Sequence, residues 1–218
     1  RDDTVLLVVD MQERLVPVVR NADRLVWNIG RLLQGARVLG VPALATEQYP
    51  RGLGATLPDI AAGLRATPDG EAETITGATT DAITGAITGA TTSATTGAIS
   101  ATPSRAIPDK LTFSAYGCAA VRERLAALGR PNVLVCGIET HVCVLQTVLD
   151  LGHAGYRVFL AEDAVESRFE SDRLTALRRM EAAGSTLTTV ESALFEWCFV
   201  AGTPEFKQVS QLVKQTFG

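Results

Sequence analysis

The strongest candidate for chemistry is a cysteine that follows an apolar, strand-like run. The run ends at Ile138, a short turn follows, and Cys143 comes at the first turn of the next predicted helix. The amino end of a helix presents free N–H groups and partial positive charge, which favour a thiolate and can hold a developing oxyanion. Position alone leaves a second interpretation equally open, because most cysteines are small buried core residues.

Two further residues could complete such a site. Asp10 ends the first strand-like run, where an aspartate often only caps the next helix. Lys110 lies in the segment 108–114, and a single lysine in a loop is usually exposed to solvent. Together they supply what a nucleophilic cysteine needs, a base to accept its proton and a cation to favour the thiolate. An aspartate and a lysine from neighbouring strand ends would do so without a histidine.

Short apolar runs alternate with segments of helical period along the chain. This alternation is typical of an α/β protein whose parallel sheet is covered by helices. Five or six parallel strands with right-handed crossovers predict a three-layer α/β/α sandwich, which binds ligands at the carboxyl ends of its strands. Strands are predicted at residues 5–10, 41–45, 132–138, 157–161 and 186–190, and helices at 22–39, 118–128, 141–151, 172–183, 191–198 and 204–215.

One segment breaks this pattern. From Ile75 to Thr102 the chain runs in tetrads rich in threonine, glycine and alanine, such as ITGA and TTGA. Such a repeat is a poor helix former and offers little to pack in a strand. We therefore expect a low-complexity insertion loop at residues 67–104 within a single domain of residues 1–218, since a longer loop costs little extra closure entropy. An extended β arm is the less favoured alternative.

Composition narrows the class of protein. The net charge is −4, with 46% hydrophobic and 20% charged residues. This balance predicts a soluble globular protein without a nucleic-acid partner, which would need a clustered basic surface. No apolar run reaches the roughly 18 residues that span a membrane. Four cysteines without a CxxC pair indicate reduced thiols and a cytoplasmic location, although a targeting segment upstream of Arg1 would not be visible.

Several motifs, in the same order along the chain, resemble those of the isochorismatase-like cysteine hydrolases. They are LLVVDMQERL, TEQYPRGLG, the K-x-x-F-S segment at Lys110–Ser114, and VLVCGIETHVCVLQTVLDL. The tail, with DRLTALRRMEAAGSTLTTVESALFEW and PEFKQVSQLVK, is similar to the isochorismatase domain-containing subgroup. The resemblance covers roughly residues 4–66 and 107–215.

The resemblance implies a parallel six-stranded sheet and an Asp–Lys–Cys catalytic set. Carried over by position, Asp10 is the base, Lys110 the cation and Cys143 the nucleophile. It also implies a non-proline cis peptide between Ile138 and Glu139. In the family this turn directs the backbone N–H matching Glu139 toward the oxyanion, beside that of Cys143.

Two departures from the wider superfamily bear on activity. Metal-binding nicotinamidases carry an Asp-x-His and a further histidine after the second strand, whereas Thr46–Pro50 contains no histidine. No metal or cofactor is therefore expected, and two histidines in the whole chain agree with this. Isochorismatases that cleave a vinyl ether lack the nucleophilic cysteine, which this chain retains. The tetrad repeat is also foreign to the family pattern.

Four residues are secondary candidates for a substrate pocket. Gln12 could orient Asp10 or could simply be a polar residue of a first helical turn. Tyr49 and Phe113 could form pocket walls, although aromatic residues are more often used for packing. His141 lies two residues before Cys143 and so does not share its helical face, which favours a place at the rim or a local cap over a role as base.

The favoured function is cysteine-dependent hydrolysis of a small carbonyl compound, an amide, through a thioester. A catalytically idle fold that serves as a protein-interaction module is the alternative. A redox role for the cysteine ranks last, because no resolving cysteine lies close to Cys143 in the sequence. We expect a small-molecule substrate and a homo-oligomer, with no nucleic-acid or membrane partner; the sequence does not identify the substrate.

Overall fold

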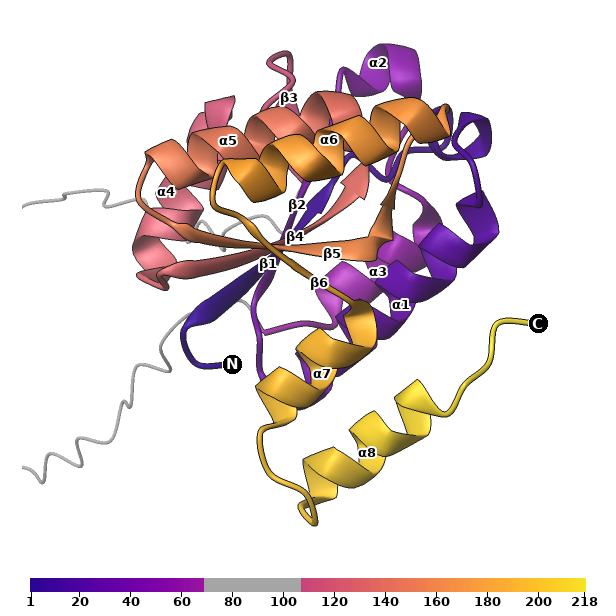
Figure 1. Cartoon of the computed structure of the whole chain (residues 1–218), viewed down its shortest axis with the longest axis vertical. Coiled ribbons are helices and arrows are strands. Elements are labelled where there is room, and N and C mark those ends of the chain that lie inside the picture. Colours follow the sequence, from indigo (N-terminus) through magenta and orange to yellow (C-terminus); the bar gives the residue numbers. More distant parts are fainter. Residues whose placement is uncertain (69–106) are drawn as a thin grey trace, which may run out of the picture.

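The computed structural model describes residues 1–68 and 107–218, and its centre is one parallel sheet (Figure 1). The six strands lie in the order β3-β2-β1-β4-β5-β6, and every adjacent pair is parallel. The predicted α/β sandwich is thus confirmed. The strands are β1 (Thr4–Val9), β2 (Ala43–Gln48), β3 (Asp109–Lys110), β4 (Asn132–Ile138), β5 (Arg157–Glu166) and β6 (Thr186–Thr188).

Helices cover both faces of the sheet, as Figure 1 shows, with α4, α5 and α6 on one face and α1, α3, α7 and α8 on the other. The helices are α1 (Ala22–Leu39), α2 (Pro50–Leu53), α3 (Pro58–Arg65), α4 (Ala119–Leu128), α5 (Leu145–His153), α6 (Glu170–Ala182), α7 (Val190–Cys198) and α8 (Pro204–Val213). Short 3-10 turns occur at Val16–Val18 and Ala115–Gly117, and a π-helical turn at Thr140–Val144.

The central strands explain the continuous apolar runs of the sequence. All six residues of β1 are buried. Leu6 and Val8 join the core beneath α1, whereas Leu7 and Val9 join the core beneath α5. A strand covered on both faces has no position for a polar side chain, so its period of two disappears and only its length and β-branched content reveal it.

The structure differs from the sequence predictions in the assignment of Lys110 and in the ends of two strands. Lys110 belongs to a two-residue strand, β3, rather than to a loop. The fifth strand continues to Glu166, past the predicted end at residue 161, and the last ends at Thr188, because the next helix begins at Val190. The predicted insertion at residues 67–104 lies outside the described residues, apart from its first two.

The strand order decides where a site can form. From β1 the chain proceeds outward through β2 to β3, and then returns to place β4 on the other side of β1. The order therefore reverses between β1 and β4, and open α/β sheets form their ligand crevice at the carboxyl ends of such a pair. Asp10 follows β1, and the turn that contains Cys143 follows β4.

Two further findings concern the described part of the chain. None of its helices combines the length and apolar character that crossing a membrane requires. Its four cysteines are all free thiols.

Close contact between β1 and β4 predicts that Gly137→Ala destabilises the fold. A Cβ at Gly137 would lie 2.1 Å from the carbonyl oxygen of Val9, and the φ of +115° disfavours any side chain. We expect the free energy of unfolding to fall by about 3 kcal/mol or more, measured by urea denaturation. The matched control is Gly152→Ala in α5, where nothing lies within 4 Å and a gain of up to about 1 kcal/mol is expected. Equal effects of the two variants would contradict this account.

Candidate active site

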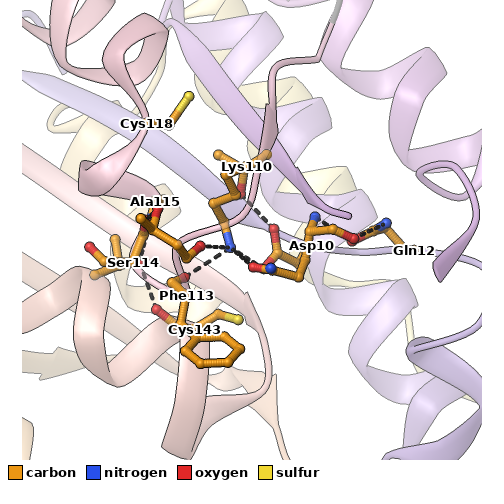
Figure 2. Close-up of polar contacts among 12 residues, drawn as sticks. Asp10, Gln12, Lys110, Phe113, Ser114, Ala115, Cys118 and Cys143 are labelled. Carbon is orange, nitrogen blue, oxygen red and sulfur yellow. Dashed lines mark hydrogen bonds and ion pairs between the residues drawn. The ribbon is translucent and has the colours of Figure 1, made fainter. Parts of the chain in front are cut away.

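Asp10 lies at the tip of β1 with its side chain completely buried. Its φ of 51° is a left-handed conformation that turns the chain away from the sheet at this point. One carboxylate oxygen, Oδ1, accepts a hydrogen bond from the Thr46 hydroxyl at 2.8 Å. The other, Oδ2, accepts one from Lys110 Nζ at 2.7 Å. The two oxygens are therefore held by groups on β2 and β3, and Figure 2 shows the Asp10–Lys110 pair.

Lys110 is a buried ammonium with a complete set of acceptors. Besides Asp10, its Nζ donates to Gln48 Oε1 at 2.7 Å and to the carbonyl oxygens of Phe113 at 2.8 Å and Thr112 at 3.3 Å. Only 1% of its side chain is exposed, so the structure rejects the interpretation of Lys110 as a surface residue. Removing one partner of such a pair leaves an uncompensated buried charge, which costs about 3–5 kcal/mol.

Cys143 lies in the π-helical turn Thr140–Val144, directly before α5. Its side chain is buried, with 6% of the residue exposed. Thr147, one turn further on, donates its hydroxyl to the Cys143 carbonyl at 2.6 Å and accepts the backbone N–H of Ala115 at 2.8 Å. Thr147 therefore connects the cysteine turn to the segment that follows Lys110.

The surroundings of Cys143 favour the thiol over the thiolate, which is opposite to the effect expected from the amino end of a helix. Burial and the adjacent Asp10 carboxylate raise the pKa of Cys143 to about 12, against the opposing effect of the Lys110 ammonium. Burial also raises the pKa of Asp10, while Lys110 and Thr46 act to lower it. Desolvation penalises every charged form in this site, and a carboxylate disfavours a second anion beside it.

Glu139 provides backbone rather than an exposed side chain to this region. The Ile138–Glu139 peptide bond is cis. The carboxylate of Glu139 accepts a hydrogen bond from Arg168 Nε at 2.9 Å and one from the Arg168 backbone N–H at 3.2 Å. The Glu139 carbonyl accepts the N–H groups of Val142 and Val144, which starts the turn that carries the cysteine.

The secondary candidates fall in different places. Gln12 is fully buried, and its amide pairs with the backbone of Gln48 and Gly54, so it supports the end of β2. The side chain of His141 contacts Ser167 through Nδ1 at 3.0 Å and lies 3.7 Å from Asp172 through Nε2.

The two aromatic candidates, Tyr49 and Phe113, are both about half exposed. Each adjoins Lys110 through a backbone hydrogen bond, because the Tyr49 N–H donates to the Lys110 carbonyl and the Phe113 carbonyl accepts from Lys110 Nζ. The structure therefore brings these two residues to the Asp–Lys–Cys site.

Sequence reasoning missed three residues of this network, Thr46, Gln48 and Thr147. A signal existed for the first two. Thr46 and Gln48 alternate in β2 and so face the same side, and Gln48 pairs in register with Lys110. Both are buried polar residues, which is unusual unless they have hydrogen-bond partners. Thr147 gave no such signal, because a threonine in a helix is commonplace.

Within the described part of the chain, no group of three or more His, Cys, Asp and Glu residues is arranged to hold a metal ion. At the carboxyl end of β2, Thr46 and Gln48 instead hydrogen-bond to the Asp10–Lys110 pair. Its polar groups are engaged in hydrogen bonds to the site itself.

A six-stranded parallel α/β/α sandwich places this chain among the isochorismatase-like folds. The chain belongs to the isochorismatase domain family, which it matches over residues 4–192. The predicted family is thereby confirmed.

Similar proteins cover almost the whole chain. It is 32% identical to mouse isochorismatase domain-containing protein 2A, over 98% of this chain and 84% of that protein. It is 33% identical to the secreted isochorismatase effector Isc1 of Phytophthora sojae, over 97% of this chain and 85% of the effector. The solved structure of the MAR1 ribonuclease from Caenorhabditis elegans superimposes with a TM-score of 0.76 at 31% identity, over 99% of this chain and 91% of that one.

The bridge through Thr147 generates a stability prediction. Thr147→Val keeps the side-chain shape but leaves the buried Ala115 N–H without its acceptor. We expect the free energy of unfolding to fall by about 1–3 kcal/mol in urea denaturation. Thr147→Ser keeps the hydroxyl and should retain more of the stability than the valine variant. If the two variants lose the same amount, the hydrogen-bonded bridge is not what stabilises this contact.

The raised pKa of Cys143 predicts an unusual effect of charge removal. Asp10→Asn deletes the carboxylate that raises the thiol pKa and leaves the Lys110 ammonium, which lowers it. The thiolate fraction at pH 8 should rise, so iodoacetamide should alkylate Cys143 at least about tenfold faster than in the wild type. The rate is followed by peptide mass spectrometry, with the partly exposed Cys198 as the internal reference. Circular dichroism checks that the variant is folded. A slower or unchanged rate at Cys143 would refute the electrostatic account.

Proposed function

We propose that the protein is a cysteine-dependent hydrolase that cleaves the C–N bond of a small amide through a thioester. The observation that carries the proposal is the buried 2.7 Å ion pair between Lys110 and Asp10, beside the buried thiol of Cys143. An ion pair with only a structural role needs no cysteine beside it, whereas here both Asp10 and Lys110 influence the pKa of Cys143. The proposal treats residues 1–218 as one catalytic domain with an insertion.

The first half of the reaction forms the thioester. Asp10 accepts the Cys143 proton as the sulfur attacks the substrate carbonyl, and the N–H groups of Glu139 and Cys143 donate to the resulting oxyanion. The C–N bond then breaks, and the leaving amine takes the proton from Asp10. The products of this half are a neutral amine and an acyl group joined to Sγ.

The second half hydrolyses the thioester. Asp10 takes a proton from water as the water oxygen attacks the acyl carbon. The tetrahedral intermediate collapses, the C–S bond breaks, and the proton on Asp10 returns to the sulfur of Cys143. The net reaction consumes one water and releases a carboxylic acid and an amine, with Asp10, Lys110 and Cys143 unchanged.

The electrostatics support a base-assisted attack. With a pKa of about 12, almost none of the Cys143 thiol is ionised at neutral pH. The proton must therefore leave as the S–C bond forms, which requires a base within reach. Lys110 favours the charged carboxylate of Asp10, and burial makes that carboxylate a stronger base.

The second candidate is an idle fold that binds other proteins. A binding module does not need to bury an ammonium with four acceptors at its sheet edge, and the complete set around Lys110 favours the enzyme. A homo-oligomer, a cytoplasmic location and the absence of nucleic-acid partners stay predictions, as does the absence of a cofactor.

Acyl trapping tests the mechanism. The protein is mixed with p-nitrophenyl esters of short carboxylic acids and the reaction is quenched in acid. The mass of the intact protein is then measured by mass spectrometry. We expect one acyl group on Cys143 and release of p-nitrophenol, with loss of the adduct and of amide turnover in Cys143→Ala. Cys198→Ala, on α7 and away from the ion pair, is the matched control and should behave as the wild type.

Two outcomes would contradict the mechanism. Turnover retained by Cys143→Ala would exclude the cysteine as nucleophile. A folded wild-type protein that acquires no acyl group and cleaves no amide would instead support the interaction module. Asp10→Asn should lose turnover even though its thiol becomes more reactive toward iodoacetamide, because the base is then missing.

A further inference from the structure

Large apolar side chains are exposed around the proposed site. Tyr49 follows β2 and is 51% exposed, while Leu111 and Phe113 follow β3 and are 79% and 52% exposed. All three lie at the carboxyl edge of the sheet, where Lys110 ends β3. Exposed apolar groups that gather beside a polar site mark a binding surface more often than a packing accident. We call these three residues the apolar rim.

The backbone of each rim residue is tied to the lysine network. The Tyr49 N–H donates to the Lys110 carbonyl at 3.0 Å, and the Phe113 carbonyl accepts from Lys110 Nζ at 2.8 Å. The Leu111 carbonyl accepts from Gln48 Nε2 at 3.1 Å, and the other end of that amide accepts from Lys110. The apolar rim is therefore positioned by the same contacts that hold the catalytic cation.

The Tyr49 ring packs against the backbone of a neighbouring glycine. It lies against Gly52, where a Cβ would come within 2.4 Å of the ring. The absence of a side chain at Gly52 thus allows the ring to pack against the short helix α2. The ring of Phe113 projects from the loop that encloses Lys110 Nζ, to the same side of the lysine as Cys143 in the view of Figure 2.

We propose that the apolar rim binds the acyl group of the substrate, which makes the substrate class the amides of apolar carboxylic acids. This inference rests on the proposed function. In that mechanism only the acyl group stays in the site through both half-reactions, first in the amide and then in the thioester on Cys143. The acyl group is therefore the part of the substrate that the apolar rim, which lies beside Lys110, can contact during both steps.

A chain-length series tests the acyl preference. The value of kcat/KM is measured for p-nitroanilides of acetic, butyric, hexanoic and benzoic acid. Each methylene that becomes buried on the apolar rim should raise kcat/KM by roughly threefold to fourfold. Phe113→Ala and Leu111→Ala should lower the hexanoyl-to-acetyl ratio by about tenfold, because the truncated side chains leave less apolar area to cover the acyl chain.

The matched control is Phe195→Ala. Phe195 is an aromatic residue of α7 that is 39% exposed and does not belong to the rim, so its loss should leave the ratio unchanged. An unchanged ratio in both rim variants would overturn the inference, as would a wild-type enzyme that prefers the acetyl compound.

A binding measurement separates this inference from the proposed function. Hexanamide and acetamide are titrated into Cys143→Ala by NMR, with and without Phe113→Ala. Preferential binding of hexanamide that is lost with Phe113→Ala would support the rim even if no amide is cleaved. Turnover without chain-length preference would support the enzyme and reject the rim. Sedimentation velocity of Phe113→Ala and Leu111→Ala tests whether the rim contacts a second copy of the chain. A variant that forms a smaller assembly than the wild type but keeps its hexanoyl-to-acetyl ratio would overturn the inference and place the rim at a subunit contact.

Discussion

The organisation of this molecule depends on burying one ammonium group at the edge of a parallel sheet. Lys110 has 1% of its side chain exposed, and its charge is neutralised by Asp10 at 2.7 Å. Bringing both groups out of water costs several kcal/mol per ion, so every remaining donor position needs an acceptor. Gln48 and the carbonyls of the following loop fill these positions. These polar contacts join the carboxyl ends of β1, β2 and the two-residue strand β3.

The same pair sets the state of the cysteine. A thiol that is buried beside a carboxylate keeps its proton, and the pKa of Cys143 rises to about 12. In the proposed mechanism the sulfur therefore keeps its proton until the bond to the substrate forms. Thr147 contributes indirectly, because its hydroxyl connects the cysteine turn to the segment after Lys110. The position of Cys143 and the charges around its sulfur therefore depend on connected contacts among Asp10, Lys110 and Thr147.

Membership of the isochorismatase domain family agrees with this arrangement without specifying a substrate. Similar proteins include a mouse isochorismatase domain-containing protein and a secreted effector of Phytophthora sojae, so one architecture occurs in very different settings. The substrate preference that we propose for this chain rests on the loops around the candidate site. Here those loops carry Tyr49, Leu111 and Phe113 on backbone that contacts the lysine network. In the hydrolysis that we propose, this apolar surface is the part of the site that selects the acyl group.

The sequence by itself determined the sheet and the family. Long β-branched runs such as β1 and β4 have few alternatives to buried strands, and ordered motifs around Asp10 and Cys143 predicted the class of site. It did not reveal β3, because two residues contain no periodicity, and so Lys110 was expected in a loop. Only the tertiary structure decided its burial and the pKa of the thiol. Both depend on desolvation and on charges that approach from distant parts of the chain, and local sequence carries no record of either.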